Sequence, residues 1–260
     1  MANIMVIGGT ADAREIIGRL AKNKNKIIAT VATYFGSKLL QDNDGVEVFE
    51  GRLTSHDMMS VISSSCIKCL VDASHPYALE VSLNAINAAR QAGIPYLRYE
   101  RKKSYLDGYN NIVYAADFEQ AAYKANDYQG NIFLAIGSRN LKVFLSIIDK
   151  YERRVFARVL PDSSIIRQCE AAGLNADNII AMKGPFSEEI NIAMLKHCCA
   201  SVLVTKDSGD IGGTPEKVSA CHKLGIPVIL VERPEVDYGT KVSSIEQVEY
   251  WVQNYVKGDG

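Results

Sequence analysis

The segment DASHPYA, residues 72–78, brings a carboxylate, a hydroxyl, an imidazole and a phenol together in the chain. His75 can donate a proton near neutral pH or hydrogen-bond an anionic substrate, and Tyr77 stands two residues further on. Pro76 is acceptable in the first turn of a helix, so the segment marks the passage from a buried strand to a helix. The alternative is that Asp72 and His75 only cap that helix and fix the loop. We favour a catalytic role for His75 and Tyr77.

A glycine turn follows the first apolar run of the chain, in IMVIGGTADAREI at 4–16. Gly8 and Gly9 would let backbone N–H groups approach a phosphate, and the N-terminus of the following helix favours negative charge. The turn departs from the Gly-x-Gly-x-x-Gly fingerprint, because Thr10 and Ala13 stand where the second and third glycines are expected. We predict phosphate binding here. The alternative is a tight connection without a ligand.

The second apolar run, 26–33, is not followed by the Asp or Glu that binds ribose hydroxyls in NAD-preferring folds. Ser37 and Lys38 come instead, and a hydroxyl beside a cation suits a 2′-phosphate. We therefore expect NADPH as the cofactor, with NADH possible. The alternative is that Lys38 is a solvated loop lysine.

Short apolar, β-branched runs alternate with helical patterns along the whole chain, which is typical of parallel sheets covered by helices on both faces. The expected strands are 3–7, 26–33, 46–50, 68–73, 95–99, 111–115, 131–136, 153–159, 178–182, 201–205 and 226–232. Helical patterns include 11–22, 76–92, 138–150, 187–199 and 214–224.

The chain partly repeats itself, since GIPYLRYER at 93–101 returns as GIPVILVER at 225–233. Each copy reads as a helix closed by Gly, followed by Ile-Pro at the start of a strand. We therefore expect an α/β fold of two Rossmann-like parallel-sheet domains facing a central cleft. Residues 1–100 would form a nicotinamide-cofactor domain and 112–260 a second domain contributing to the substrate cleft, with the polar stretch 101–111 as linker.

Open parallel sheets bind ligands beyond the carboxyl ends of their strands, and the expected strand ends here are polar. Besides DASHPYA they read AIGSRNL (135–141), ARVLP (157–161), KGPFSEEIN (183–191) and VTKDSGDIGGTPEK (204–217). In the last of these, we expect the backbone of Ser208, Gly209 and the following glycines to bind an anion, with charge from Lys206 and Lys217. The alternative for Lys217 is a solvated helix residue.

Composition excludes several classes of function. The formal net charge of −1 argues against a globally basic nucleic-acid binder. No apolar stretch approaches the roughly 20 residues of a membrane span, and the N-terminus lacks a signal-peptide pattern, so we expect a cytoplasmic protein. The four histidines do not have the spacing of metal ligands. Cys66 and Cys69 form a Cys-x-x-Cys motif, but it lies before the expected strand 68–73, whereas a thioredoxin-type redox motif follows a strand and begins a helix. We expect no metal.

Taken together, these motifs resemble those of the precorrin-6A reductase / cobalt-precorrin-6A reductase family of cobalamin biosynthesis, over nearly the full length. The resemblance rests on GGTADAR, DASHPYA with Asn84, GIPYLRYER, ARVLP, GPFS with Asn191, and TKDSG followed by GG and EK. It implies that a nicotinamide hydride reduces a ring D double bond of precorrin-6A, a macrocycle rich in acetate and propionate carboxylates, or of its cobalt form. It also implies two Rossmann-like domains with cofactor and macrocycle between them.

The candidate site residues follow from these readings. We expect His75, Tyr77 and Lys206 to be catalytic, and Gly8, Gly9, Thr10, Ser37, Lys38, Asp72 and Ser74 to bind the cofactor. We expect the substrate to be bound by Arg98, Arg101, Gly137, Ser138, Arg139, Arg158, Lys183, Ser187, Lys206, Asp207, Ser208, Gly209 and Lys217.

One different class of function remains open, a nucleotide-dependent transferase similar to a glycosyltransferase with two Rossmann-like domains. It would use the same glycine turns and cationic strand ends but would not oxidise a nicotinamide. If the protein is a reductase, its binding partner is the small-molecule tetrapyrrole substrate, and we expect it to bind neither nucleic acid nor a membrane.

Overall fold

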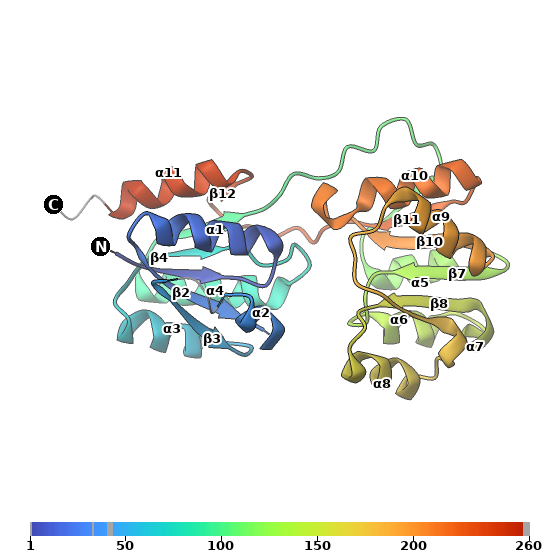
Figure 1. Cartoon of the computed structure of the whole chain (residues 1–260), viewed down its shortest axis with the longest axis horizontal. Helices are drawn as coiled ribbons and strands as arrows, with labels where there is room; N and C mark the ends of the chain where they lie inside the picture. The colour runs from blue at the N-terminus through green and yellow to red at the C-terminus, as the bar shows by residue number, and fades with distance from the viewer. Residues whose placement is uncertain (1, 33, 41–43, 257–260) are drawn as a thin grey trace. The chain divides into compact units, whose positions relative to one another are not determined.

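The structure is a computed structural model that describes residues 2–32, 34–40 and 44–256. It divides into two compact units, each an α/β sheet with helices on both faces (Figure 1). The first unit takes the chain up to Lys102 together with the segment from Glu235 onward. The second unit is continuous, from Lys103 to Pro234.

The first unit is a parallel sheet of six strands in the order β12-β5-β4-β1-β2-β3. Its strands are β1 (Asn3–Ile7), β2 (Lys26–Val31), β3 (Val46–Glu50), β4 (Ile67–Asp72), β5 (Tyr96–Tyr99) and β12 (Lys241–Val242). Its helices are α1 (Ala11–Lys22), α2 (Tyr34–Lys38), α3 (Ser55–Ser64), α4 (Leu79–Ala92) and α11 (Ile245–Val256).

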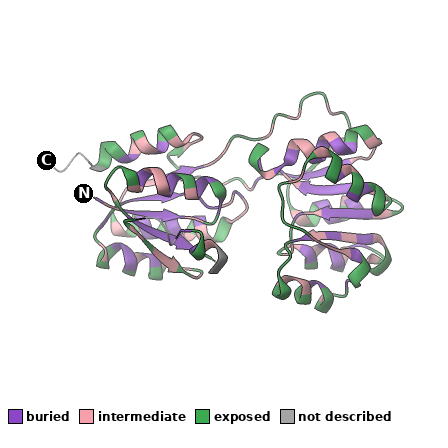
Figure 2. Ribbon diagram, in the orientation of Figure 1, coloured by how far each residue is buried: buried purple, intermediate pink, exposed green. Residues whose placement is uncertain are grey.

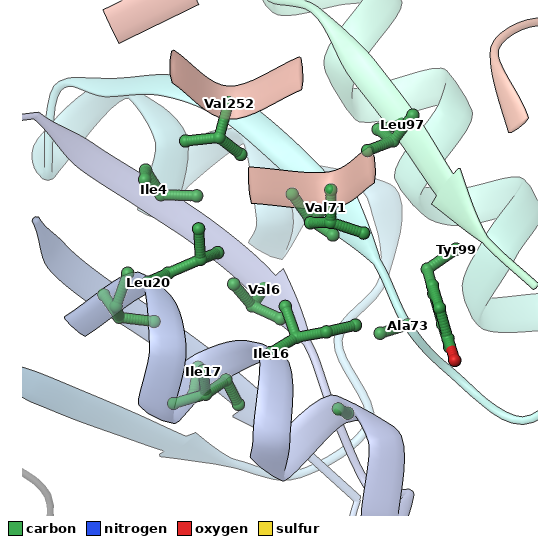
Figure 3. Close-up of a cluster of buried hydrophobic side chains, with 14 of the residues drawn as sticks. Ile4, Val6, Ile16, Ile17, Leu20, Val71, Ala73, Leu97, Tyr99 and Val252 are labelled. Carbon is green, nitrogen blue, oxygen red and sulfur yellow. The ribbon is translucent and has the colours of Figure 1, made fainter. Parts of the chain in front are cut away.

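Alternation along β1 builds the two cores of this unit. Ile4 and Val6 face α1 and α11, where Val252 packs over the sheet (Figure 3). Met5 and Ile7 face the opposite layer, formed by α3 and α4. Because both faces are covered, the strands read as continuous apolar runs, as expected for a buried parallel sheet.

The second unit repeats this design with the strand order β6-β11-β10-β7-β8-β9, again all parallel. Its strands are β6 (Ile112–Ala115), β7 (Asn131–Ala135), β8 (Val155–Val159), β9 (Ile179–Ala181), β10 (Ala200–Lys206) and β11 (Val228–Val231). Its helices are α5 (Phe118–Asn126), α6 (Leu141–Ile147), α7 (Tyr151–Arg154), α8 (Ser163–Ala171), α9 (Glu188–His197) and α10 (Thr214–Leu224). Figure 2 shows the same burial in both units, with purple strands inside and green outer faces on the helices.

The repeat seen in the sequence has a structural counterpart. Helices α4 and α10 each end at a glycine, Gly93 and Gly225, in the left-handed conformation with φ of 67°. The next residue closes the same cap in each copy, Ile94 N–H to the Ala89 carbonyl and Ile226 N–H to that of Cys221. Glycine is required there because other residues resist positive φ.

The sequence-based domain boundaries need one correction. Residues 112–260 were expected to form the second domain, but the segment from Glu235 onward belongs to the first unit. There β12 pairs with β5, and α11 covers the sheet beside α1. Conversely, β6 occupies the edge of the second sheet next to β11. The first sheet therefore receives its edge strand β12 from beyond the second unit, whereas the edge strand β6 of the second sheet precedes β7 in the same unit. The chain crosses between the units twice.

Candidate functional site

The glycine turn between β1 and α1 is shaped for a close ligand approach. A side chain on Gly8 would lie 3.3 Å from Val31 Cγ1 and 3.4 Å from the Thr30 carbonyl, so only glycine fits without movement. At Gly9, with φ of 108°, nothing stands within 4 Å of where a Cβ would be. The backbone is thus open on one side at the N-terminus of α1, and it fits a cofactor phosphate.

Thr10 connects this turn to the loop after β4. Its Oγ1 accepts the Ala13 N–H at 3.0 Å, which caps α1, and donates to the Ala73 carbonyl at 3.2 Å. The residue that replaces the second glycine of the fingerprint therefore has a structural role in holding two candidate loops together.

Arg101, expected to bind substrate, is paired within the first unit. Its Nη2 lies 2.9 Å from Asp12 Oδ2, in the first turn of α1. Burial raises the pKa of Asp12, and the Arg101 charge opposes that rise. The pair reduces the negative charge that Asp12 would otherwise place beside the glycine turn.

Asp72 is a fully buried acceptor, and this corrects three predictions. Its Oδ1 accepts the Ser74 N–H at 3.0 Å and lies 2.9 Å from Arg98 Nη1, while Oδ2 accepts the hydroxyls of Ser82 and Tyr96 at 2.6 and 2.8 Å. Arg98 is also fully buried and donates to Ser74 Oγ at 3.0 Å. Asp72 and Ser74 were expected to bind cofactor and Arg98 substrate. The structure uses all three inside the unit, since unpaired buried charges are costly.

The loop held by this network carries His75 and Tyr77 at partly exposed positions. His75 Nδ1 accepts the Tyr77 N–H at 3.2 Å, so Nε2 bears the proton in the neutral ring. Helix α4 begins at Leu79 with Ala78 as its N-cap residue and has no side-chain cap. Asp72 does fix the loop, but neither Asp72 nor His75 caps the helix.

Ser37 and Lys38 lie on α2, directly after β2. The Lys38 side chain is exposed, whereas Ser37 is buried. Of the two residues expected at the 2′-phosphate, Lys38 is therefore the one with an accessible group.

In the second unit, the carboxyl ends of β8 and β10 and the first turn of α10 contribute cations to one cluster. Arg158, on β8, donates to Asn191 Oδ1 at 2.8 Å and lies 4.4 Å above the Phe186 ring. Burial lowers its pKa to about 10. Burial, together with the nearby Arg139 charge, lowers the pKa of Lys206 to about 8.

Lys217 is the most enclosed member of this cluster. It is 6% exposed, and burial, Arg158 and Lys206 lower its pKa to about 7. The solvated alternative for Lys217 is thereby excluded. We call Arg158, Lys206 and Lys217 the cation cluster.

The glycine-rich loop after β10 is closed by its own hydrogen bonds, which corrects the expected anion site on its backbone. Ser208 N–H donates to Thr214 Oγ1 at 3.1 Å and Gly209 N–H to Asp207 Oδ1 at 3.0 Å. The N–H groups of the two later glycines bind carbonyls within the loop. Asp207, expected to bind substrate, also accepts the Ser104 N–H and pairs with Arg233 at 3.3 Å. An anion here would be held by side chains, because these backbone donors are already used.

The other expected substrate residues of this unit lie at strand ends and are mostly exposed. Gly137, Arg139, Lys183 and Ser187 are exposed, and Ser138 is half-buried. Ser187 is also the N-cap of α9, accepting the Ile190 N–H.

Sequence reasoning missed three apolar residues at the same strand ends. Leu160 follows β8, Met182 follows β9 and Ile211 lies in the loop after β10, with 53%, 43% and 56% of their surfaces exposed. These side chains would offer apolar contacts to a ligand bound at this edge. The available signal was their place near the ends of predicted strands: Leu160 follows 153–159, Met182 ends 178–182 and Ile211 lies in the glycine-rich segment after 201–205.

Among the residues the structure describes, no group of three or more His, Cys, Asp or Glu could hold a metal ion. None of the described helices combines the length and the apolar character that a membrane crossing requires.

Residues 3–253 match the family model described as Precorrin-6x reductase CbiJ/CobK. The cobalt-precorrin-6A reductase of Priestia megaterium is 38% identical over 255 residues, covering 98% of this chain and 99% of that one. The cobalt-precorrin-6A reductase of Salmonella typhimurium is 35% identical over 233 residues, covering 89% and 88%.

Among solved structures, the CobK precorrin-6A reductase superimposes with a TM-score of 0.81 at 21% identity, covering 98% of both chains, and so shares the fold. The predicted α/β fold of two parallel-sheet units and the predicted precorrin-6A reductase function are both confirmed. The chain belongs to the precorrin-6x reductase CbiJ/CobK family and is an oxidoreductase of cobalamin biosynthesis.

Proposed function

We propose that this protein reduces cobalt-precorrin-6A with NADPH, adding a hydride and a proton across one double bond of the macrocycle. The observation that carries the substrate assignment is that the cation cluster and the exposed side chains Leu160, Met182 and Ile211 all follow or end strands at the same edge of the second sheet. A macrocycle with apolar faces and a carboxylate-bearing rim needs both kinds of group. The cobalt form is favoured because relatives at 35–38% identity bear the name cobalt-precorrin-6A reductase, whereas those at 26% and 24% are named precorrin-6A reductase.

The first unit is the proposed cofactor unit. The open backbone at Gly9 and the N-terminus of α1 would hold the phosphates, with Arg101 offsetting the Asp12 charge. Lys38 would bind the 2′-phosphate that distinguishes NADPH from NADH. The bound nicotinamide supplies the hydride.

His75 is the proposed proton donor. Its Nε2 carries the proton of the neutral ring, and the Asp72 network holds the loop on which it lies. Tyr77 would keep the imidazole in place through its N–H. Lys206 is the second candidate proton donor, since burial has already lowered its pKa to about 8.

We place the protein in the cytoplasm, where reduced nicotinamide cofactor is produced.

The test compares initial rates with precorrin-6A and cobalt-precorrin-6A, each with NADPH and with NADH. We expect the highest kcat/KM for cobalt-precorrin-6A with NADPH. Lys38→Ala should lower the NADPH/NADH preference about tenfold or more, because a charge-assisted hydrogen bond contributes roughly 1.5–3 kcal/mol. An unchanged preference in Lys38→Ala would remove Lys38 from the cofactor site.

A further inference from the structure

Lys217 is a buried amine without an anionic partner. It lies in the first turn of α10, and its Nζ donates to the Gly212 carbonyl at 3.4 Å, a long hydrogen bond. Among the ion pairs within 4 Å in the described part of the chain, none includes Lys217. An ammonium in that position would lack the compensation that buried charges need.

The charged groups around Lys217 come from three elements and the glycine loop. Arg158 on β8 and Lys206 on β10 are positive, while Glu216 on α10 and Asp207 in the loop are negative. Asp207 is already paired with Arg233. Burial and the two cations outweigh the two acids, so the amine loses its proton near pH 7.

We propose that Lys217 is a carboxylate-binding residue that becomes charged only when substrate binds. The neutral amine takes one proton from solvent onto its Nζ lone pair, and the resulting ammonium pairs with one carboxylate of the macrocycle. No bond of the substrate changes in this step. The inference rests on the proposed function, because it requires the macrocycle to lie at these strand ends.

The direction of the pH dependence follows from this linkage. With a pKa of about 7, the Lys217 side chain is mostly neutral above pH 7 in the free protein and mostly charged at pH 6. Substrate binding at pH 7.5 should therefore consume protons, and binding at pH 6 almost none. Above pH 7, affinity should fall by up to about tenfold per pH unit, since each binding event must first charge the amine.

The binding test is calorimetric titration of the full-length protein with cobalt-precorrin-6A, without nicotinamide. Titrations at pH 7.5 in phosphate and in Tris, buffers of different ionisation enthalpy, give the number of protons taken up. We expect at least about half a proton more for the wild type than for Lys217→Met. Lys196→Met, at an exposed lysine on α9, is the matched control and should behave as the wild type. Equal uptake in Lys217→Met and wild type would overturn the inference.

A second measurement needs no substrate. The neutral amine gains its proton on unfolding, so between about pH 7 and 10 the unfolding constant of the wild type should fall up to about tenfold per pH unit relative to Lys217→Met. A pH-independent ratio would mean that Lys217 is already charged and would overturn the inference. A confirmed neutral amine with no proton uptake on binding would also overturn it, while leaving the reductase function intact. Absence of macrocycle binding would refute the proposed function together with the inference.

Discussion

At the scale of single residues, some cations at the strand ends are paired with carboxylates inside the first unit, whereas others form the cation cluster of the second unit. Arg98 and Arg101 resemble Arg158 and Lys206 in sequence, as cations at strand ends. The first two are paired with Asp72 and Asp12, whereas the other two belong to the cation cluster. A chain-wide pattern cannot separate these cases, because Arg101 and Asp12 are far apart in sequence and meet only through the fold.

Replacing Asp72 with Asn should destabilise the first unit strongly. The substitution removes the carboxylate that lies 2.9 Å from fully buried Arg98 and leaves only the longer pair with Glu100, at 3.9 Å. Breaking such a buried pair costs about 3–5 kcal/mol. Denaturant unfolding measures this loss. The control is Glu47→Gln, which breaks the exposed pair with Lys26 and should barely move the midpoint. Equal midpoints for both variants would show that Asp72 does not support the unit.

Replacing His75 with Ala should abolish most turnover while the protein stays folded and binds NADPH normally. The side chain is partly exposed and does not cap α4, so little stability depends on it. General acid catalysis of this kind contributes about 10²–10⁴-fold. Initial rates and a thermal melt of the same sample separate the roles. A lowered melting temperature with a near-normal rate would assign His75 to the loop alone.

At the scale of elements, most strands lie where continuous apolar runs predicted them, because strands buried on both faces leave a strong sequence signal. The edge strand β12 has only two residues, Lys241–Val242, and carries no such pattern. The sequence placed the glycine-rich loop after β10 correctly, but the backbone N–H groups of Ser208 and Gly209 donate to Thr214 and Asp207, not to an anion. Its glycines let the loop fold tightly on itself. A glycine-rich sequence is equally compatible with such a closed loop and with a loop whose backbone binds an anion.

Gly212→Ala should disrupt that loop. The new methyl group would overlap the Ser208 Cβ, closer than van der Waals contact allows, and the loop could not keep its hydrogen bonds to Thr214 and Asp207. We expect weaker macrocycle binding, measured by calorimetry. The matched control is Gly18→Ala on α1, where nothing lies within 4 Å of the added Cβ. That variant should gain about 0.5–1 kcal/mol in stability. Unchanged binding in Gly212→Ala would separate the loop from the substrate site.

At the scale of the whole molecule, the two crossings make the first unit dependent on the end of the chain. Helix α11 supplies Val248 and Val252 to the core that also contains Ile4 and Val6 (Figure 3). The repeat in the sequence predicted two similar units correctly, but not this return. Contact between the two ends of the chain depends on tertiary packing, and no local pattern encodes it.

Val252→Ala should lower the stability of the first unit by about 2 kcal/mol, since it removes two buried methyl groups and leaves a cavity. The affected unfolding transition should be the one that NADPH shifts upward, because ligand binding stabilises the unit that binds it. Gln253→Ala, exposed on the same helix, is the control. A loss in the transition that NADPH does not shift would contradict the assignment of cofactor to the first unit.

The most direct test of the central claim is a single-turnover reaction with the protein in excess over cobalt-precorrin-6A and NADPH in excess over both. Nicotinamide oxidation and the macrocycle spectrum are followed together. We predict one NADPH oxidised per macrocycle, with both signals changing at the same rate. Macrocycle that stays unreduced, with no NADPH consumed, would contradict the reductase function and favour a nucleotide-dependent transferase.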